Sequence, residues 1–238
     1  MKILALDTTA KVASAALCEN GALLGEYTLN NGNTHSETIL PMAESILKAF
    51  EITPKDIDVF AVSAGPGSFT GVRIGVATVK GLAFASGKPC IGVSTLEALA
   101  KNPALANGLI CPVMNARRNQ VYTALFRATN GVLERLMPDS AIAIKELDQI
   151  LSQYDEPVTL CGDGYEITEA LLTHEIAPLP ERLRHQSAFN VALCAMEAIE
   201  RGEATTDIEL SPTYLRLSQA ERERNEREAA KNDLNNII

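Results

Sequence analysis

Two of the four asparagine–glycine pairs in the sequence, Asn20-Gly21 and Asn130-Gly131, each lie between two apolar segments of strand length. Such a pair is the most specific short signal for a two-residue β-hairpin, because both residues tolerate the positive φ angles of the tight turn. The pattern therefore predicts an antiparallel hairpin early in each half of the chain.

Alternating strand and helix patterns follow each hairpin. Short apolar runs bounded by turn residues predict strands, and apolar residues three and four positions apart predict helices. In the first half we expect strands at residues 2–8, 13–18, 23–29, 58–63 and 90–93, and helices at 36–50, 70–86 and 95–101. In the second half we expect strands at residues 109–115, 120–128, 132–137 and 158–161, and helices at 144–153, 165–174 and 187–201.

Both halves share one order of elements, which favours an α/β fold made of two halves, each a mixed β-sheet flanked by helices. We assign residues 1–102 to an N-terminal domain, 103–218 to a smaller C-terminal domain, and 219–238 to a charged, flexible tail. The alternative stays open that the shared order has no special meaning, because any α/β chain of this length shows some such match between its halves.

The charge balance bears on the class of partner. The chain of 238 residues carries 21 basic and 30 acidic side chains, a formal charge of −9. Phosphate backbones dominate nucleic-acid affinity, so direct nucleic-acid binding by this chain is disfavoured. The five cysteines have no metal-ligand spacing and are expected to be small buried hydrophobes. No apolar run reaches membrane-spanning length, and Asp7 comes too early for a signal peptide, which predicts a cytoplasmic protein.

Three segments at strand ends are candidate phosphate-binding loops. An acid with two hydroxyls, as in Asp7-Thr8-Thr9, can hold hydrated magnesium and phosphate oxygens. Glycines before a helix, as at Gly65 and Gly67, let the backbone approach an anion, although this loop matches neither the Walker nor the dinucleotide pattern. The third segment is Gly162-Asp163-Gly164. The alternative for all three is close packing of ordinary turns.

The helix after the glycine loop carries two rows of small residues. Gly71 and Gly75 form one row, and Ala77, Gly81 and Ala85 form the other. Each glycine inside a helix costs about 1 kcal/mol against alanine, so close packing should offset this cost. The rows predict close contact either with the protein's own sheet or with a helix of a partner.

Together these motifs resemble a known family. Residues 3–9, 65–75, 81–83 and 115–122 are similar to the bacterial tRNA threonylcarbamoyladenosine biosynthesis protein TsaB, also called YeaZ, and residues 212–216 resemble its C-terminal signature. The family usually has aspartate where this chain has Asn115. The resemblance implies two ribonuclease-H-like halves, as in actin and the sugar kinases.

The resemblance also implies a role without catalysis. TsaB resembles a shortened paralogue of TsaD, which transfers threonylcarbamoyl to N6 of adenosine 37 in tRNAs that read codons starting with A. TsaD carries a His-x-x-x-His metal pair, and here Thr95 and Leu99 stand at those places. The absence of both histidines argues against a metal site and a catalytic residue in this chain. It also argues against the older grouping with metallopeptidases.

The implied partners are TsaD, in a heterodimer, and the ATPase TsaE. A homodimer is expected when TsaD is absent, tRNA is contacted only through the complex, and no membrane is involved. No intrinsic cofactor is expected, although ATP or ADP with magnesium can lie at or near the partner interface. The interface is expected on two helices, at Ile39, Ala43, Gly71, Gly75, Thr78, Gly81 and Ala85. The alternative function is a nucleotide-binding phosphotransferase or ATPase of the actin-like superfamily.

Overall fold

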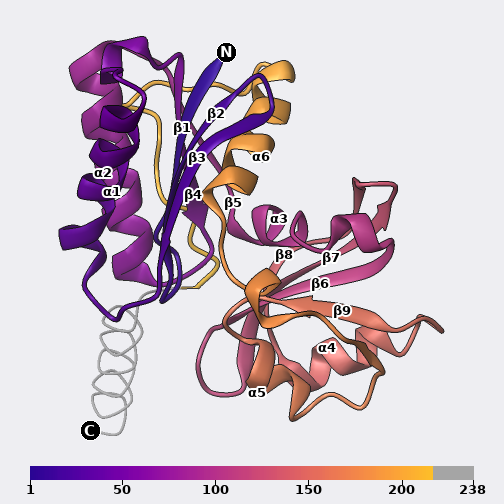
Figure 1. The fold of residues 1–238 in the computed structure, drawn as a ribbon. Coiled ribbons are helices and arrows are strands. Elements are labelled where there is room, and N and C mark those ends of the chain that lie inside the picture. Colours follow the sequence, from indigo (N-terminus) through magenta and orange to yellow (C-terminus); the bar gives the residue numbers. More distant parts are fainter. Residues whose placement is uncertain (217–238) are drawn as a thin grey trace, which may run out of the picture.

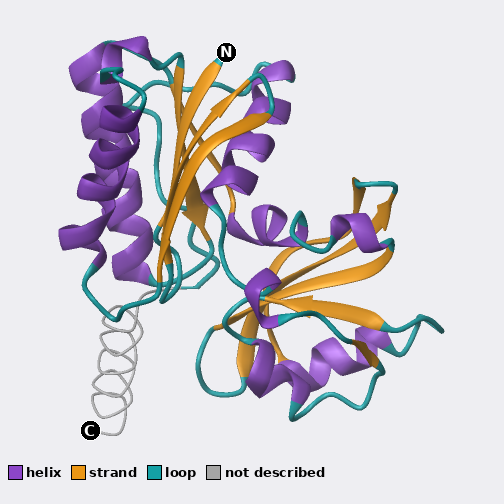
Figure 2. Cartoon of the chain, in the orientation of Figure 1, coloured by secondary structure: helices purple, strands orange, loops and turns teal. Residues whose placement is uncertain are grey.

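The structure is a computed structural model, and it describes residues 1–216. Two α/β halves lie side by side, each with its own sheet (Figures 1 and 2). The tail predicted at residues 219–238 lies outside the described residues. Within residues 1–216, no helix combines the length and the apolar character needed to cross a bilayer. All five cysteines are buried and none forms a disulfide, as expected.

The two sheets have the same topology. In the first sheet the strand order is β3-β2-β1-β4-β5, and in the second it is β8-β7-β6-β9-β10. The first strand of each sheet pairs antiparallel with the next strand on one side and parallel with the fourth strand on the other. The strands are β1 (Lys2–Asp7), β2 (Ala13–Glu19), β3 (Ala22–Leu29), β4 (Val59–Gly65), β5 (Cys90–Ser94), β6 (Gly108–Asn115), β7 (Gln120–Thr129), β8 (Val132–Ala143), β9 (Val158–Cys161) and β10 (Ile176–Ala177). This shared topology confirms the predicted fold of two mixed sheets flanked by helices.

Both predicted hairpin turns are present. Asn20 and Gly21 have φ angles of 50° and 81°, and Asn130 and Gly131 have φ angles of 51° and 83°. Positive φ at both central residues is the geometry of a type I′ turn, whose twist matches that of the flanking strands. The turns fix the register of the strands that build the sheets.

Helices cover the outer face of each sheet. On the first sheet, α1 (His35–Ala49) and α2 (Phe69–Ser86) bury an apolar stripe against β1, β2 and β4. On the second sheet, α4 (Ile144–Leu151) and α5 (Tyr165–Glu169) bury their apolar side chains against β6, β7 and β9. Short 3₁₀ turns lie at Pro54–Asp56, Ala104–Ala106 and Glu181–Leu183.

The remaining two α-helices of residues 1–216 each pack on the sheet of the other half. Helix α3 (Thr95–Ala100) follows the first sheet, but Leu96 and Leu99 pack with Ile110 and Phe126 of the second. Helix α6 (Ala188–Glu200) follows the second sheet, but its apolar face packs on β1, β2, β4 and β5 of the first. The sequence division at residue 102 assigns α6 to the C-terminal half, whereas its core contacts lie in the N-terminal half.

Two elements end five or more residues away from their predicted boundaries, and one short strand is additional. Strand β8 continues to Ala143 instead of ending at Met137, because Pro138 lies in an irregular stretch where the register with β7 shifts and pairing then resumes. Helix α5 ends at Glu169 instead of His174, where the Asp148 carboxylate accepts the backbone N–H groups of Thr173 and His174. Strand β10 has only two residues and was not predicted.

The start of α6 depends on one carboxylate from β3. Glu26 Oε1 accepts hydrogen bonds from Ser14 Oγ (3.0 Å), Ser187 Oγ (2.8 Å) and the Phe189 N–H (3.2 Å). A negative charge is favourable at a helix N-terminus, where backbone N–H groups lack intrahelical partners. These bonds join α6 to the edge of the first sheet.

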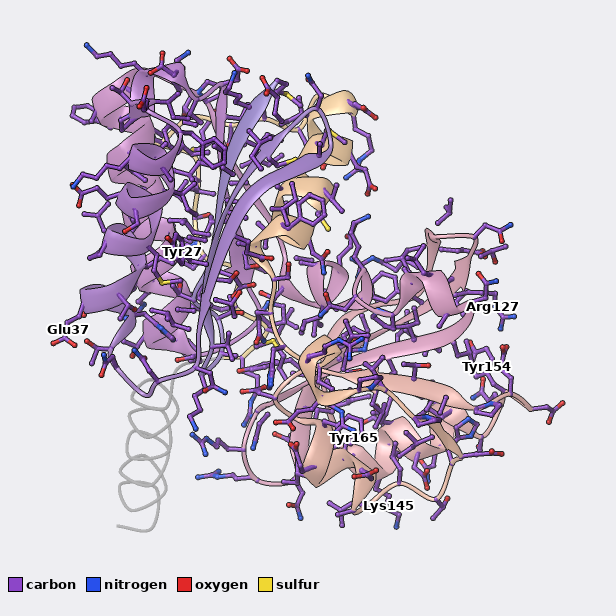
Figure 3. All side chains as sticks on the ribbon, in the orientation of Figure 1. Tyr27, Glu37, Arg127, Lys145, Tyr154 and Tyr165 are labelled. Atoms are coloured by element: carbon purple, nitrogen blue, oxygen red, sulfur yellow. The ribbon has the colours of Figure 1, made fainter. Side chains whose placement is uncertain are left out.

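We expect Glu26→Ala to lower the free energy of unfolding by about 1–3 kcal/mol, because it leaves buried donors unsatisfied. Urea unfolding followed by circular dichroism measures this loss. Glu26→Gln keeps an acceptor oxygen and should lose less. Glu37→Ala is the control, since Glu37 is exposed on α1, at the margin of the molecule in Figure 3. Equal losses for Glu26→Ala and Glu37→Ala would contradict this account.

Candidate functional site

A cleft of about 720 Å³ lies between the two halves. It is bordered on one side by the turn after β1 and the glycine loop before α2, and on the other by the β6–β7 hairpin. Its lining residues are Thr9, Ala10, Lys11, Gly67, Ser68, Phe69, Thr70, Met114, Asn115, Ala116, Arg117, Tyr122, Asp163 and Arg216. Of the seven predicted phosphate-binding residues, only Thr9 and Gly67 are in this set.

The turn after β1 is buried, and its polar side chains form hydrogen bonds within the protein. Asp7, Thr8 and Thr9 are at most 1% exposed. One carboxylate oxygen of Asp7 accepts from the Thr9 N–H (2.9 Å) and Thr9 Oγ1 (2.7 Å), and the other accepts from Ser63 Oγ. Thr8 Oγ1 donates to the Gly71 carbonyl (2.7 Å). These groups therefore hold the turn together and do not present a carboxylate to the cleft.

The glycine loop is pressed against this turn. The Ser68 N–H donates to the Thr9 carbonyl (2.7 Å), and Ser68 caps α2 by accepting from the Gly71 N–H. A Cβ on Gly67 would lie 2.5 Å from the Thr9 carbonyl oxygen, and one on Gly71 would lie 2.0 Å from that of Thr8. The glycines are needed for this backbone contact. Little space is left between the two segments, which agrees with the alternative of close packing.

The remaining predicted glycines also serve internal contacts. Gly162 has a φ of +107°, and a Cβ there would lie 2.2 Å from the Val113 carbonyl oxygen. Gly164 approaches the backbone of the same β6 strand and donates its N–H to Val113. Gly65 has a φ of +122°, and a Cβ added there would lie 2.3 Å from the Thr213 carbonyl oxygen. The predicted role of these positions in phosphate binding is therefore not supported by their surroundings.

The segment that meets Gly65 crosses from one half to the other. We call residues 210–216 the C-terminal strap. Leu210 is buried in the core of the first half, and the Thr213 N–H donates to the Ala64 carbonyl (2.7 Å). The Tyr214 ring stacks on Phe69, with centroids 4.8 Å apart.

The far end of the strap reaches the second half. The Arg216 guanidinium donates to the Ala116 carbonyl (2.7 Å), and Leu215 packs on the core cluster of the second half. The sequence pointed to residues 212–216 only as a family signature. In the structure they tie the two sides of the cleft together.

The β6–β7 hairpin supplies the polar side of the cleft. The Asn115 N–H donates to Asp163 Oδ1 (3.0 Å), and Asn115 Oδ1 accepts the Arg117 N–H (2.8 Å). An aspartate at position 115 could accept the same bond, so the asparagine keeps the turn geometry without the charge. Lys11, Arg117 and Arg216 bring positive charge to the cleft. Sequence reasoning did not assign these three side chains to one site, because only the fold brings them together.

The interface prediction needs a correction at four of its seven positions. Ile39 and Ala43 are 1% exposed in the core under α1, and Gly71 and Gly75 face Thr8 on the inner side of α2. A side chain at any of these positions cannot touch a partner while the fold is intact. The other three lie further out: Thr78 is half-buried, and Gly81 and Ala85 are exposed.

Burial gives Asp7 a measurable pH signature. It raises the pKa of the Asp7 carboxyl above the ordinary 3.8, and hydrogen bonds from Ser63 and Thr9 oppose that shift. From pH 3.8 up to the raised pKa, the folded protein binds a proton that the unfolded chain has released. The free energy of unfolding therefore falls as the pH rises through this window.

We expect Asp7→Asn to remove that slope, since an amide does not titrate and can still accept the bonds from Thr9. Urea unfolding at a series of pH values, for both proteins, measures the difference. Parallel curves for the two proteins would show that Asp7 does not titrate differently on folding.

Comparison with known proteins identifies the family. The chain is 33% identical over 222 residues to the tRNA threonylcarbamoyladenosine biosynthesis protein TsaB of Bacillus subtilis, covering 93% of this chain and 96% of that protein. The chain belongs to the TsaB family. It is also 33% identical to TsaB of Escherichia coli over 70% of this chain and 73% of that one. The solved structure of YeaZ from Pseudomonas aeruginosa superposes with a TM-score of 0.79 at 27% identity, covering 90% of this chain and 99% of that one.

A related family is longer than this TsaB-family chain. Residues 23–224 match the family model described as TsaD: tRNA N6-adenosine threonylcarbamoyltransferase. The tRNA N6-adenosine threonylcarbamoyltransferase of Methylorubrum extorquens is 31% identical over 69% of this chain, but the match covers only 52% of that enzyme. The chain thus spans about half the length of this transferase.

Proposed function

We propose that this chain is a non-catalytic, activating subunit in the addition of threonylcarbamoyl to N6 of adenosine 37 in tRNAs that read codons starting with A. Its partner is a TsaD-type transferase, and the ATPase TsaE joins the pair. tRNA is contacted only through the complex. The observation that carries the proposal is the closed contact between the turn after β1 and the glycine loop.

That contact bears on catalysis because these are two of the loops whose sequence suggested phosphate binding. Here the loops close the space between them, with Ser68 bonded to Thr9 and Gly71 lying directly against Thr8. Opening the space would expose the buried Asp7 carboxylate and break its three hydrogen bonds. A nucleotide handled by the complex is therefore placed by this proposal at or near the partner interface, not in the glycine loops of this chain.

Two positions on helix α3 agree with a role other than catalysis of the threonylcarbamoyl transfer. Thr95 and Leu99 are 0% and 1% exposed, and Leu99 packs against the second sheet. Neither side chain offers an imidazole for iron or zinc, and both positions are enclosed by core residues. Metal-dependent transfer is therefore assigned to the partner.

The docking surface that we propose is the outer side of α1 and α2. It carries Leu40, which is 50% exposed, and Phe84, which is 78% exposed, together with the small residues Gly81 and Ala85. Exposed apolar side chains beside small residues favour close helix packing against another protein. In the absence of the transferase, a second copy of the chain binds the same surface.

The test is reconstitution of the reaction. Purified transferase, ATPase, a threonylcarbamoyl-adenylate source and tRNA are mixed with and without this chain, and modified adenosine is measured by mass spectrometry. We expect modification to require the chain, and the chain alone to produce none. Equal modification without it would overturn the proposal. Turnover of magnesium-ATP by the isolated chain would instead favour the phosphotransferase alternative.

A further inference from the structure

A second pocket, of about 250 Å³, lies beside the main cleft and shares Ala10, Lys11 and Asp163 with it. We call it the side pocket. Its walls are the turn between β1 and β2, the loop before α5, and the segment that leads into α6. It is smaller than the cavities of about 300–1,000 Å³ that hold drug-sized ligands, so its size suits a small metabolite.

One buried donor in the side pocket has no partner. Gln186 lines the pocket and is 3% exposed, and its amide Nε2 makes no hydrogen bond to any residue of the described chain. Burying an amide N–H without an acceptor costs about 1–3 kcal/mol, so buried donors are normally paired. An acceptor oxygen brought by a ligand would satisfy this group.

The side pocket is also surrounded by charges of both signs. Lys11 and Arg184 are positive, and Asp163, Glu166 and Glu181 are negative. None of these five side chains forms a salt bridge with another residue between positions 1 and 216, whereas eight other ion pairs occur in that part of the chain. Unpaired opposite charges around one small cavity suit a ligand that carries both charges itself.

One wall of the side pocket is held in place. The Arg184 guanidinium carbon lies 3.5 Å from the ring centroid of Tyr165, and Arg184 Nε donates to the Leu179 carbonyl (3.0 Å). Tyr165 lies on α5, as labelled in Figure 3. The Gly162 N–H donates to the Arg184 carbonyl (2.7 Å), which joins this wall to the loop before α5.

We propose that the side pocket binds a free α-amino acid, whose carboxylate accepts from Gln186 and meets Lys11 and Arg184, and whose ammonium group meets Glu166 and its neighbouring carboxylates. A carboxylate supplies the acceptor that Gln186 lacks, and a zwitterion offers each sign of charge on the walls an opposite partner without adding net charge. This proposal does not depend on the proposed function, because it concerns the isolated chain.

The test is a thermal-shift and calorimetric titration of the full chain with glycine, L-alanine, L-serine, L-glutamine, L-glutamate and L-lysine. We expect at least one of them to raise the Tm by about 3–6 °C at a tenfold excess over its Kd. Acetate and methylammonium, which carry one charge each, should bind at least tenfold more weakly. Acetate binding as tightly as the amino acid would overturn the zwitterion assignment, as would the absence of binding by the whole panel.

Gln186→Leu separates a ligand-binding role from a structural one. It removes a donor that has no partner, so the free variant should melt no lower than the original protein, while amino-acid affinity should fall at least tenfold. Gln149→Leu, at an exposed position on α4, is the matched control and should bind normally. If Gln186→Leu fails to fold, Glu166→Gln tests the ammonium side and should also lose affinity. Full affinity in the folded Gln186→Leu variant, or in Glu166→Gln, would refute the proposal.

Discussion

Replacing Gly71 by alanine is expected to lower the free energy of unfolding by about 3 kcal/mol or more. The new Cβ would lie 2.0 Å from the Thr8 carbonyl oxygen, and backbone cannot move aside there without separating α2 from β1. The same movement would break the bond from Thr8 Oγ1 to the Gly71 carbonyl. Loss of helical signal in urea, followed by circular dichroism, measures the effect.

Gly81→Ala is the matched control, because Gly81 lies on the same helix and a Cβ added there would meet nothing within 4 Å. Alanine is a better helix former, so this variant should gain up to about 1 kcal/mol. Opposite signs for the two substitutions are expected. A loss at Gly81 as large as that at Gly71 would mean that both rows of small residues pack inside the chain.

Replacing Phe84 by glutamine is expected to weaken binding to a TsaD-type partner by about 30-fold, the effect of removing an interface hot spot. The ring is 78% exposed, so its loss should leave the fold intact and the Tm within about 2 °C. Isothermal titration with the purified transferase gives the affinity. Because the proposed activation requires the complex, modification of tRNA in the reconstituted reaction should fall in parallel.

Leu105→Gln is the control for that experiment. Leu105 is 86% exposed but lies in the C-terminal half, at Ala104–Ala106, away from α1 and α2. It should bind the partner normally. If instead Leu105→Gln reduces binding and Phe84→Gln does not, the docking surface lies on the C-terminal half.

Local chemistry was enough to predict most elements. The turns at Asn20 and Asn130 require positive φ, which few residues adopt readily, so their hairpins could be placed from the sequence. Local chemistry does not show which face of a helix packs inside the fold and which face meets solvent. Gly75 and Gly81 lie on one helix in similar surroundings of sequence, yet the first meets Thr8 and Val62 and the second meets solvent.

The candidate site was harder to predict for the same reason. A glycine loop before a helix looks alike whether its space holds a phosphate or another backbone segment, and here it holds the turn at Thr9. Lys11, Gln186 and Arg216 are far apart in the sequence, and only Arg216 belongs to a motif, the family signature at residues 212–216. Only the crossing of the strap and the return of α6 to the first sheet bring them near the cleft.

The exchange of α3 and α6 between the halves has a consequence for the nascent chain. As the ribosome releases the N-terminal half, the face of the first sheet that holds Ile3, Ala5 and Ala61 stays bare until α6 has been synthesised. During that interval the chain displays an apolar surface of the kind that chaperones bind and that drives aggregation. A fragment that stops at residue 102 would keep this apolar surface exposed. Each half can therefore complete its folding only when nearly the whole polypeptide has emerged.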